Sequence, residues 1–142
     1  MKYRASALLL TIAFCCLSGC GSELDLVPVT GKVLVDGQPY GNAKVLAYPT
    51  DGPSGFGMTN AQGEFELATR DLSGVKVGSY TFTVTPDARE PVPDPNKPVV
   101  ILQVPYDSKY RDRRQSDLYH EVVAGGKNYI TIDLTAGTVT PQ

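Results

Sequence analysis

The chain has 142 residues, a formal net charge of −2, 14 glycines, 11 prolines and no tryptophan. This length suits one domain with a single core, and the glycine and proline content indicates the many short turns that are typical of an all-β domain. The acidic balance excludes general affinity for nucleic-acid phosphates, which needs clustered positive charge, so we expect no nucleic-acid partner.

The first twenty residues have the pattern of an export signal. Lys2 and Arg4 precede an apolar run over residues 5–17, which has the length of a secretory signal core and leads into Leu17-Ser18-Gly19-Cys20. A membrane-spanning helix needs about 20 apolar residues, so an uncleaved anchor fits this run poorly. A secretory signal that is cut at a small residue without lipid attachment is the other alternative.

This segment resembles the signal of bacterial lipoproteins, in which the tetrapeptide ending in cysteine is the lipobox. The resemblance implies that residues 1–19 are removed and that Cys20 carries diacylglycerol on its thiol and a fatty acid such as palmitate on its amino group. The chain would then contact a membrane through Cys20. Gly21 stands where lipoproteins of the inner membrane typically have Asp, which implies the outer membrane, facing the periplasm or the exterior. The other cysteines, Cys15 and Cys16, lie in the removed segment, so no disulfide is expected.

We expect residues 20–28 to tether the domain to the lipid. The first strand is predicted over residues 29–35, with alternate residues facing the core, and Asp36-Gly37 after it predicts a type I′ hairpin turn. A second strand is predicted over residues 43–48, ending at Pro49. Residues 50–57 are rich in glycine and proline and predict a loop.

Two strand-like runs between Met58 and Leu67 flank a turn that contains Asn60 and closes at Gly63. Phe65 and Leu67 are predicted to point inward, while the glutamates between and beside them face water. Residues 70–77 predict a loop. Residues 78–85 predict a strand in which Tyr80, Phe82 and Val84 alternate with threonines.

Residues 86–98 hold five prolines and predict an extended excursion rather than a helix or a central strand. Strand 99–104, a charged loop over residues 106–117, and a closing hairpin of strands 118–123 and 128–134 follow. We expect a C-terminal tail over residues 137–142. Seven or eight strands at this spacing predict a β-sandwich of transthyretin-like or immunoglobulin-like type over residues 29–136.

Several motifs resemble the carboxypeptidase regulatory-like, transthyretin-like domain family. They are Val29-Thr30-Gly31-Lys32-Val33, Asp36-Gly37-Gln38-Pro39, Ala43-Lys44-Val45, Thr59-Asn60-Ala61-Gln62-Gly63-Glu64-Phe65 and Gly78-Ser79-Tyr80. The later Pro105, Lys109-Tyr110, Ser116-Asp117-Leu118, Gly126-Lys127-Asn128 and Asp133-Leu134 are similar to the tail of small bacterial lipoproteins built on that domain. Asn60 stands where family members commonly have Asp, which weakens any argument for a metal there. The resemblance implies an accessory, non-enzymatic surface domain.

Catalysis would have to use His120, the single histidine, with Ser108 or Ser116 as nucleophile and Asp117 or Glu121 as orienting group. No Gly-x-Ser-x-Gly elbow is present, and a histidine beside Glu121 on a strand is more typical of a cross-strand surface pair. We therefore predict no enzyme, and a hydrolase that uses His120 is the weakest alternative.

Metal sites are also disfavoured by the sequence. Zinc needs three or four His, Cys or carboxylate ligands, and a single histidine with no mature cysteine beyond the lipidated one does not satisfy this need. Calcium could take oxygens from Asp87, Glu90 and Asp94, but their spacing matches no EF-hand loop. We expect no metal and no cofactor.

The loop over residues 106–117 carries the candidate ligand-contacting residues Tyr106, Tyr110, Arg113 and Arg114. The tyrosines could stack on sugars, and the arginines could form a positive patch. In the plainer alternative, Tyr110 closes the open end of the sandwich and the charges form local ion pairs. The sequence thus predicts a lipid-anchored, non-catalytic protein of the cell envelope that acts in structure or in contacts with other envelope proteins, with a glycan-binding module as the alternative.

Overall fold

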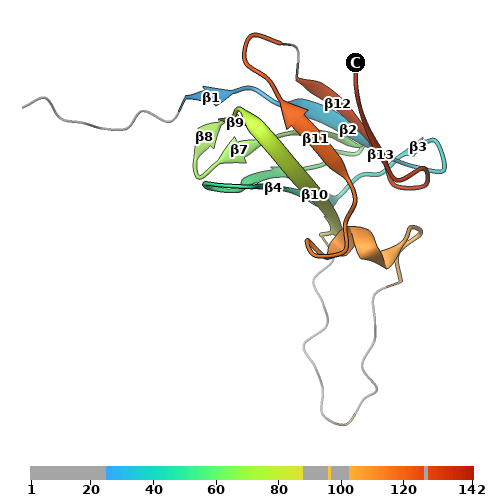
Figure 1. Ribbon diagram of the computed structural model, residues 1–142. Helices are drawn as coiled ribbons and strands as arrows, with labels where there is room; N and C mark the ends of the chain where they lie inside the picture. Colours follow the sequence, from blue (N-terminus) through green and yellow to red (C-terminus); the bar gives the residue numbers. More distant parts are fainter. Residues whose placement is uncertain (1–24, 88–95, 97–102, 127) are drawn as a thin grey trace, which may run out of the picture.

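The computed structural model describes residues 25–87, 96, 103–126 and 128–142. The predicted signal, the lipidation site Cys20, most of the tether, most of the proline-rich excursion and most of predicted strand 99–104 lie outside the described residues. Within the described part, the chain is built from β-strands and one 3-10 turn without an α-helix (Figure 1), which confirms the all-β prediction. No helix among the described residues has the length and apolar character needed to cross a bilayer.

The larger sheet has six strands in the order β11-β10-β4-β5-β7-β8. Its strands are β11 (Tyr119–Val122), β10 (Gly78–Pro86), β4 (Ala43–Pro49), β5 (Gly55–Met58), β7 (Ala68–Thr69) and β8 (Leu72–Ser73). All neighbours in this sheet are antiparallel. The long β10–β4 pair forms its centre, with seven residue pairs running from Tyr80 opposite Pro49 to Pro86 opposite Ala43.

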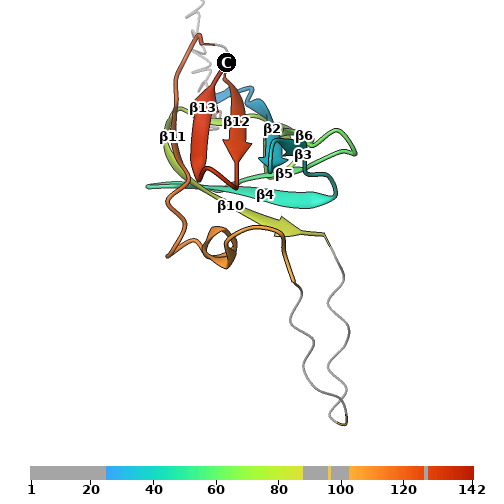
Figure 2. The same cartoon turned by 90° about the vertical axis from the view of Figure 1, so that its right-hand side faces the viewer.

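The second sheet has five strands. Its path is β13 (Thr138–Pro141), β12 (Tyr129–Asp133), β2 (Thr30–Val35) and β3 (Gln38–Pro39), and β6 (Glu64–Glu66) pairs with the first half of β2. The β12–β2 pair is parallel, and the others are antiparallel. Figure 2 shows this sheet above the β4–β10 layer, with the strands of the two layers crossing. A small third sheet joins β1 (Leu26–Val27) to β9 (Val75–Lys76).

One apolar core fills the space between the two larger sheets, as in a β-sandwich. The five-stranded sheet contributes Val33, Ile130 and Ile132, and the six-stranded sheet contributes Tyr80 and Phe82, all at most 1% exposed. These residues lie at alternate positions of their strands, because successive side chains in a strand point to opposite faces. The inward faces predicted for strands 29–35, 78–85 and 128–134 are thereby confirmed.

Two turns match the prediction closely. Asp36 and Gly37 both have positive φ, at 49° and 73°, as a type I′ hairpin requires. In the second turn, the side-chain oxygen of Asn60 accepts hydrogen bonds of 2.9 Å from the backbone N–H groups of Gln62 and Glu64. These bonds, together with φ of 73° at Gly63, redirect the chain from β5 into β6.

The predicted closing hairpin of strands 118–123 and 128–134 is wrong. β11 pairs with β10 in the larger sheet, whereas β12 lies between β13 and β2 in the other sheet. The segment 123–128 therefore crosses from one sheet to the other. Buried Asn128 holds it there, because its side-chain amide donates to the carbonyl of Val123 at 3.0 Å and accepts from the N–H of Val123 at 3.2 Å.

Four other segments differ from the prediction. Residues 55–57, where a loop was expected, form strand β5 together with Met58, and Gly55 and Gly57 let this strand approach Val75 and Glu66 too closely for a side chain. Residues 138–141 form the edge strand β13 rather than a tail, and residues 26–27 of the tether form β1. The predicted loop at residues 70–77 holds the short strands β8 and β9.

Candidate functional site

The predicted ligand-contacting residues lie in one loop, residues 106–117, packed beside the end of β10 (Figure 1). The loop contains the 3-10 turn η1 (Ser108–Arg111), which begins after Asp107 because that carboxylate accepts a hydrogen bond from the N–H of Lys109 at 2.9 Å. Asp112 then accepts from the N–H of Arg114 at 2.8 Å. Both aspartates thus use their carboxylates to shape the backbone.

An ion pair crosses this loop. The Lys109 ammonium lies 2.8 Å from the Asp117 carboxylate, which is 60% exposed. The hydrogen bond from Lys109 lowers the pKa of Asp117, and the same bond raises the pKa of Lys109. The expected local ion pairing is thereby present, and the exposure of the carboxylate makes its contribution to stability small.

Tyr110 and Tyr106 both turn inward from the loop. Tyr110 is 4% exposed, and a methyl group built at Gly137 would lie 2.2 Å from its hydroxyl oxygen, so the ring is wedged against the turn between β12 and β13. Tyr106 donates a hydrogen bond of 2.9 Å to the carbonyl of Val84, and its ring meets Tyr40 edge to face at 5.4 Å. Burial, with a further contribution from Tyr40, raises the pKa of Tyr106 well above its usual range. Neither ring presents an open face on which a sugar could stack.

The two arginines occupy different surroundings. The Arg113 guanidinium lies over the ring of Tyr48 on β4, 5.0 Å from its centroid, in cation–π geometry. Arg114 is exposed. The loop therefore uses both predicted tyrosines and one arginine for contacts within the domain, although Arg113, like Arg114, is exposed to solvent.

His120 lies on β11 directly opposite Tyr80 of β10, so the expected cross-strand placement is confirmed. Partial burial lowers the pKa of His120, and the charge of Glu121 opposes this shift. Ser116 donates its hydroxyl to the carbonyl of Phe82 at 2.5 Å, and Asp117 is engaged by Lys109. In the described part of the chain, no hydrogen bond joins His120 to Ser108, Ser116, Asp117 or Glu121, so the hydrogen-bonded geometry of a triad is not formed.

The structure describes only one of the three residues that the calcium alternative would use. Asp87 forms an ion pair of 2.8 Å with Lys44, while Glu90 and Asp94 lie outside the described residues. Over residues 25–87, 103–126 and 128–142, no three His, Cys, Asp or Glu side chains gather in a way that could hold a metal ion.

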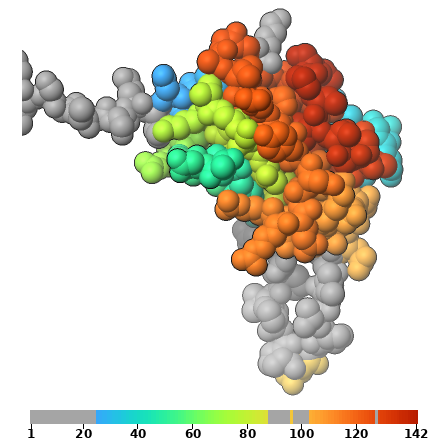
Figure 3. All heavy atoms as spheres, viewed as in Figure 1, coloured from blue at the N-terminus to red at the C-terminus, as the bar shows by residue number. Residues whose placement is uncertain are grey.

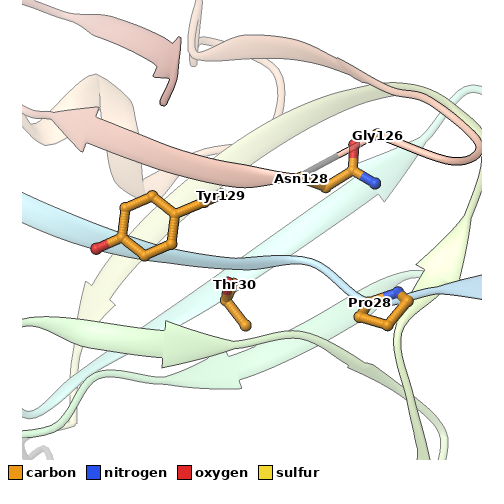
Figure 4. A pocket seen from close by; sticks show the side chains of 5 residues that line it. All are labelled: Pro28, Thr30, Gly126, Asn128 and Tyr129. Carbon is orange, nitrogen blue, oxygen red and sulfur yellow. The ribbon is translucent and has the colours of Figure 1, made fainter.

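The sequence did not predict two adjoining hollows on the five-stranded sheet. The first, of about 360 Å³, is lined by Pro28, Thr30, Gly126, Asn128 and Tyr129 (Figure 4). The second, of about 410 Å³, shares Thr30 and Tyr129 and reaches Glu64 and Glu66. They arise because the parallel pairing places Tyr129 beside Thr30, 99 positions apart in the chain, and local patterns do not reveal such a pairing. Their linings contain no histidine or cysteine and no paired acid and base.

Comparisons with protein-family models, with curated proteins and with solved structures found no match to this chain.

Proposed function

We propose that the protein is a lipid-anchored, non-catalytic component of a bacterial cell envelope, held at the outer membrane through Cys20, and that its sheet domain acts as a structural or protein-interaction module. The observation that carries this proposal is the tetrapeptide Leu17-Ser18-Gly19-Cys20 directly after a charged start and an apolar run. The order of the chain agrees with it, since the first described strand begins at Leu26, six residues after Cys20.

The internal contacts of the 106–117 loop favour a module of this kind over a glycan-binding domain. Tyr106 and Tyr110, the two rings that would stack on a sugar, are engaged with Val84 and with the β12–β13 turn. The engagement of Ser116 with Phe82 and of Asp117 with Lys109, rather than with His120, likewise argues against a serine hydrolase.

We also propose that the domain belongs to the carboxypeptidase regulatory-like, transthyretin-like family. The places of the shared motifs in the sandwich support this assignment. Val29-Thr30-Gly31-Lys32-Val33 leads into and forms the first part of β2, Asp36-Gly37 is the hairpin turn, and the segment from Thr59 to Phe65 carries the chain into β6, which pairs with β2.

Labelling with radioactive palmitate tests the anchor. The full chain is expressed in a bacterial host together with Cys20→Ala and, as a matched control in the apolar run, Cys16→Ala. We expect label and membrane recovery for the wild type and Cys16→Ala, and loss of both for Cys20→Ala. Label that persists in Cys20→Ala would contradict the proposal.

Binding to sugars and hydrolysis can be tested on the same protein. We expect any glycan binding seen on an array to be unchanged in Arg114→Ala, an exposed residue of the candidate set. We also expect no esterase or peptidase activity that disappears in His120→Ala. Loss of glycan binding in Arg114→Ala would favour the glycan-binding module, and loss of hydrolysis in His120→Ala would favour the hydrolase, provided that the variant keeps the wild-type melting temperature.

A further inference from the structure

Three aliphatic side chains stand out into solvent at the end of the sandwich where the chain enters from Cys20. Leu72 is 55% exposed, Val77 is 51% exposed and Val123 is 50% exposed. We call these residues the anchor-proximal cluster. Leu72 lies on β8, Val77 lies between β9 and β10, and Val123 directly follows β11.

Strand pairing brings the cluster close to the first described strand. Leu26 of β1 lies opposite Lys76, which precedes Val77. Val122 lies opposite Gly78, so Val77 and Val123 are the next residues beyond the end of the β10–β11 pair. Figure 1 shows β8, β9 and β1 side by side, with the turn after β11 at the same end, and Figure 3 shows the atoms of this region next to those of β1.

Leu72 is tied to the same place through Gly74. A methyl group built at Gly74 would lie 2.6 Å from the carbonyl oxygen of Val27 and 3.3 Å from the β-carbon of Leu26. The β8–β9 segment is therefore in contact with β1, and Leu72 is two residues from that contact.

The length of the tether limits how far this end can be from a bilayer. Five residues, Gly21–Asp25, separate Cys20 from Leu26. A fully extended chain spans at most about 3.5 Å per residue, so the six steps from Cys20 to Leu26 reach at most about 21 Å. If Cys20 is acylated, the cluster cannot move far from the headgroups.

We propose that the anchor-proximal cluster inserts into the headgroup region of the bilayer that holds Cys20 and thereby orients the domain end-on to the membrane. This inference rests on the proposed lipidation of Cys20. Aliphatic side chains without a surrounding aromatic or arginine cluster suit an apolar lipid boundary better than the centre of a protein interface, which is enriched in aromatic residues and arginine.

The charges around the cluster point to insertion by apolar contact rather than by attraction to anionic lipid. Arg70 and Lys76 are exposed near it, but so are Asp25, Glu66, Asp71 and Glu121, so the surroundings are not net positive. The exposed residues at the opposite end of the sandwich include the polar side chains of Asp36, Gln38 and Thr135, and the N–H of Asp36 donates a hydrogen bond to the hydroxyl of Thr135 there. The end-on orientation leaves that far end facing away from the lipid.

The lack of tryptophan in the chain provides a direct test. Single tryptophans are introduced as Leu72→Trp and Val123→Trp in the full lipidated protein. Two controls are Phe56→Trp, an exposed apolar position on the outer face of the larger sheet, and Ala136→Trp, in the turn at the far end. Each protein is reconstituted into phosphatidylcholine vesicles with and without bromine on the acyl chains, and vesicle flotation and the wild-type melting temperature are checked for each.

We expect a blue shift and bromine quenching of the tryptophan emission for Leu72→Trp and Val123→Trp, and neither effect for Phe56→Trp or Ala136→Trp. Flotation without quenching at positions 72 and 123, or with stronger quenching at position 56, would overturn the end-on insertion while leaving the anchor intact. Failure of the wild type to float would overturn the anchor and the insertion together. If one of the two tryptophan variants fails to fold, Val77→Trp takes its place under the same criteria.

Discussion

Gly31 lies in the middle of β2, where it pairs in parallel with Ile130 of β12 and on its other side with Phe65 of β6. A methyl group built at Gly31 would lie 2.3 Å from the carbonyl oxygen of Ile130 and 2.7 Å from the ring of Phe65. The nearest obstacle is backbone, so a Gly31→Ala variant can be accommodated only if β12 moves away from β2.

The cost of this substitution follows from three contributions. Overpacking a core costs about 1–3 kcal/mol, and each weakened hydrogen bond between the strands adds about 0.5–1.5 kcal/mol. The smaller entropy of the unfolded alanine chain returns about 0.4–1 kcal/mol. We therefore expect Gly31→Ala to lose about 2 kcal/mol of the free energy of unfolding, which corresponds to a fall of about 8 °C in melting temperature for a domain of this size.

Thermal unfolding of a form that begins at Gly21, followed by circular dichroism, measures this effect. Gly126→Ala is the matched control, because the close contact of a methyl group there, at 2.9 Å, is with the exposed side chain of Val123, and the carbonyl oxygen of Val123 lies at 3.9 Å, an ordinary van der Waals distance. We expect the control to melt within about 2 °C of the wild type, as surface substitutions usually do. Equal melting temperatures for Gly31→Ala and the wild type would refute the close parallel pairing of β2 with β12.

Three further predictions concern single polar groups. Asn60→Ala removes the oxygen that accepts two backbone hydrogen bonds and is expected to cost about 1–2 kcal/mol in urea unfolding. Asn60→Asp keeps that acceptor but loses the exposed hydrogen bond of 3.2 Å that the Asn60 amide donates to the Glu64 carboxylate, and it is expected to cost less than Asn60→Ala. His120 is expected to titrate in NMR with a pKa below 6.5, because burial lowers it. The unfolded state then binds the proton more readily than the folded state, so the stability that depends on neutral His120 is fully present above the unfolded pKa and is lost as the pH falls below it. His120→Gln is expected to remove this dependence of stability on pH. A pKa at or above 6.5 would contradict the placement of this ring. Tyr106→Phe leaves the carbonyl of Val84 without its donor, which is expected to cost about 1 kcal/mol, and should remove the phenol that ionises at unusually high pH in an absorbance titration.

The sequence predicted the features that depend on neighbouring residues. The Asp36-Gly37 turn was predictable because few residues adopt two successive positive φ angles. The strand through Tyr80, Phe82 and Val84 was predictable because alternate apolar residues mark one face of a sheet, and all three are buried. The alternation did not show that Thr83, on the opposite face, is also only 2% exposed, since that depends on what covers the sheet.

Pairing between distant strands was not predictable in the same way. Strands 119–122 and 129–133 have the pattern of a hairpin, yet they lie in different sheets because β12 finds its partner in β2, about a hundred residues earlier. The candidate loop shows the same limit. Tyr106 and Tyr110 look like ligand-contacting rings in a polar segment, and only the fold shows that they face Val84 and Gly137.

Mass spectrometry of the N-terminal peptide from the membrane-extracted protein tests the central proposal most directly. The proposal predicts a peptide that begins at Cys20 and carries the added mass of diacylglycerol on sulfur and of a fatty acid on the amino group. A peptide that begins at another residue, or that contains Cys20 without added mass, would contradict it.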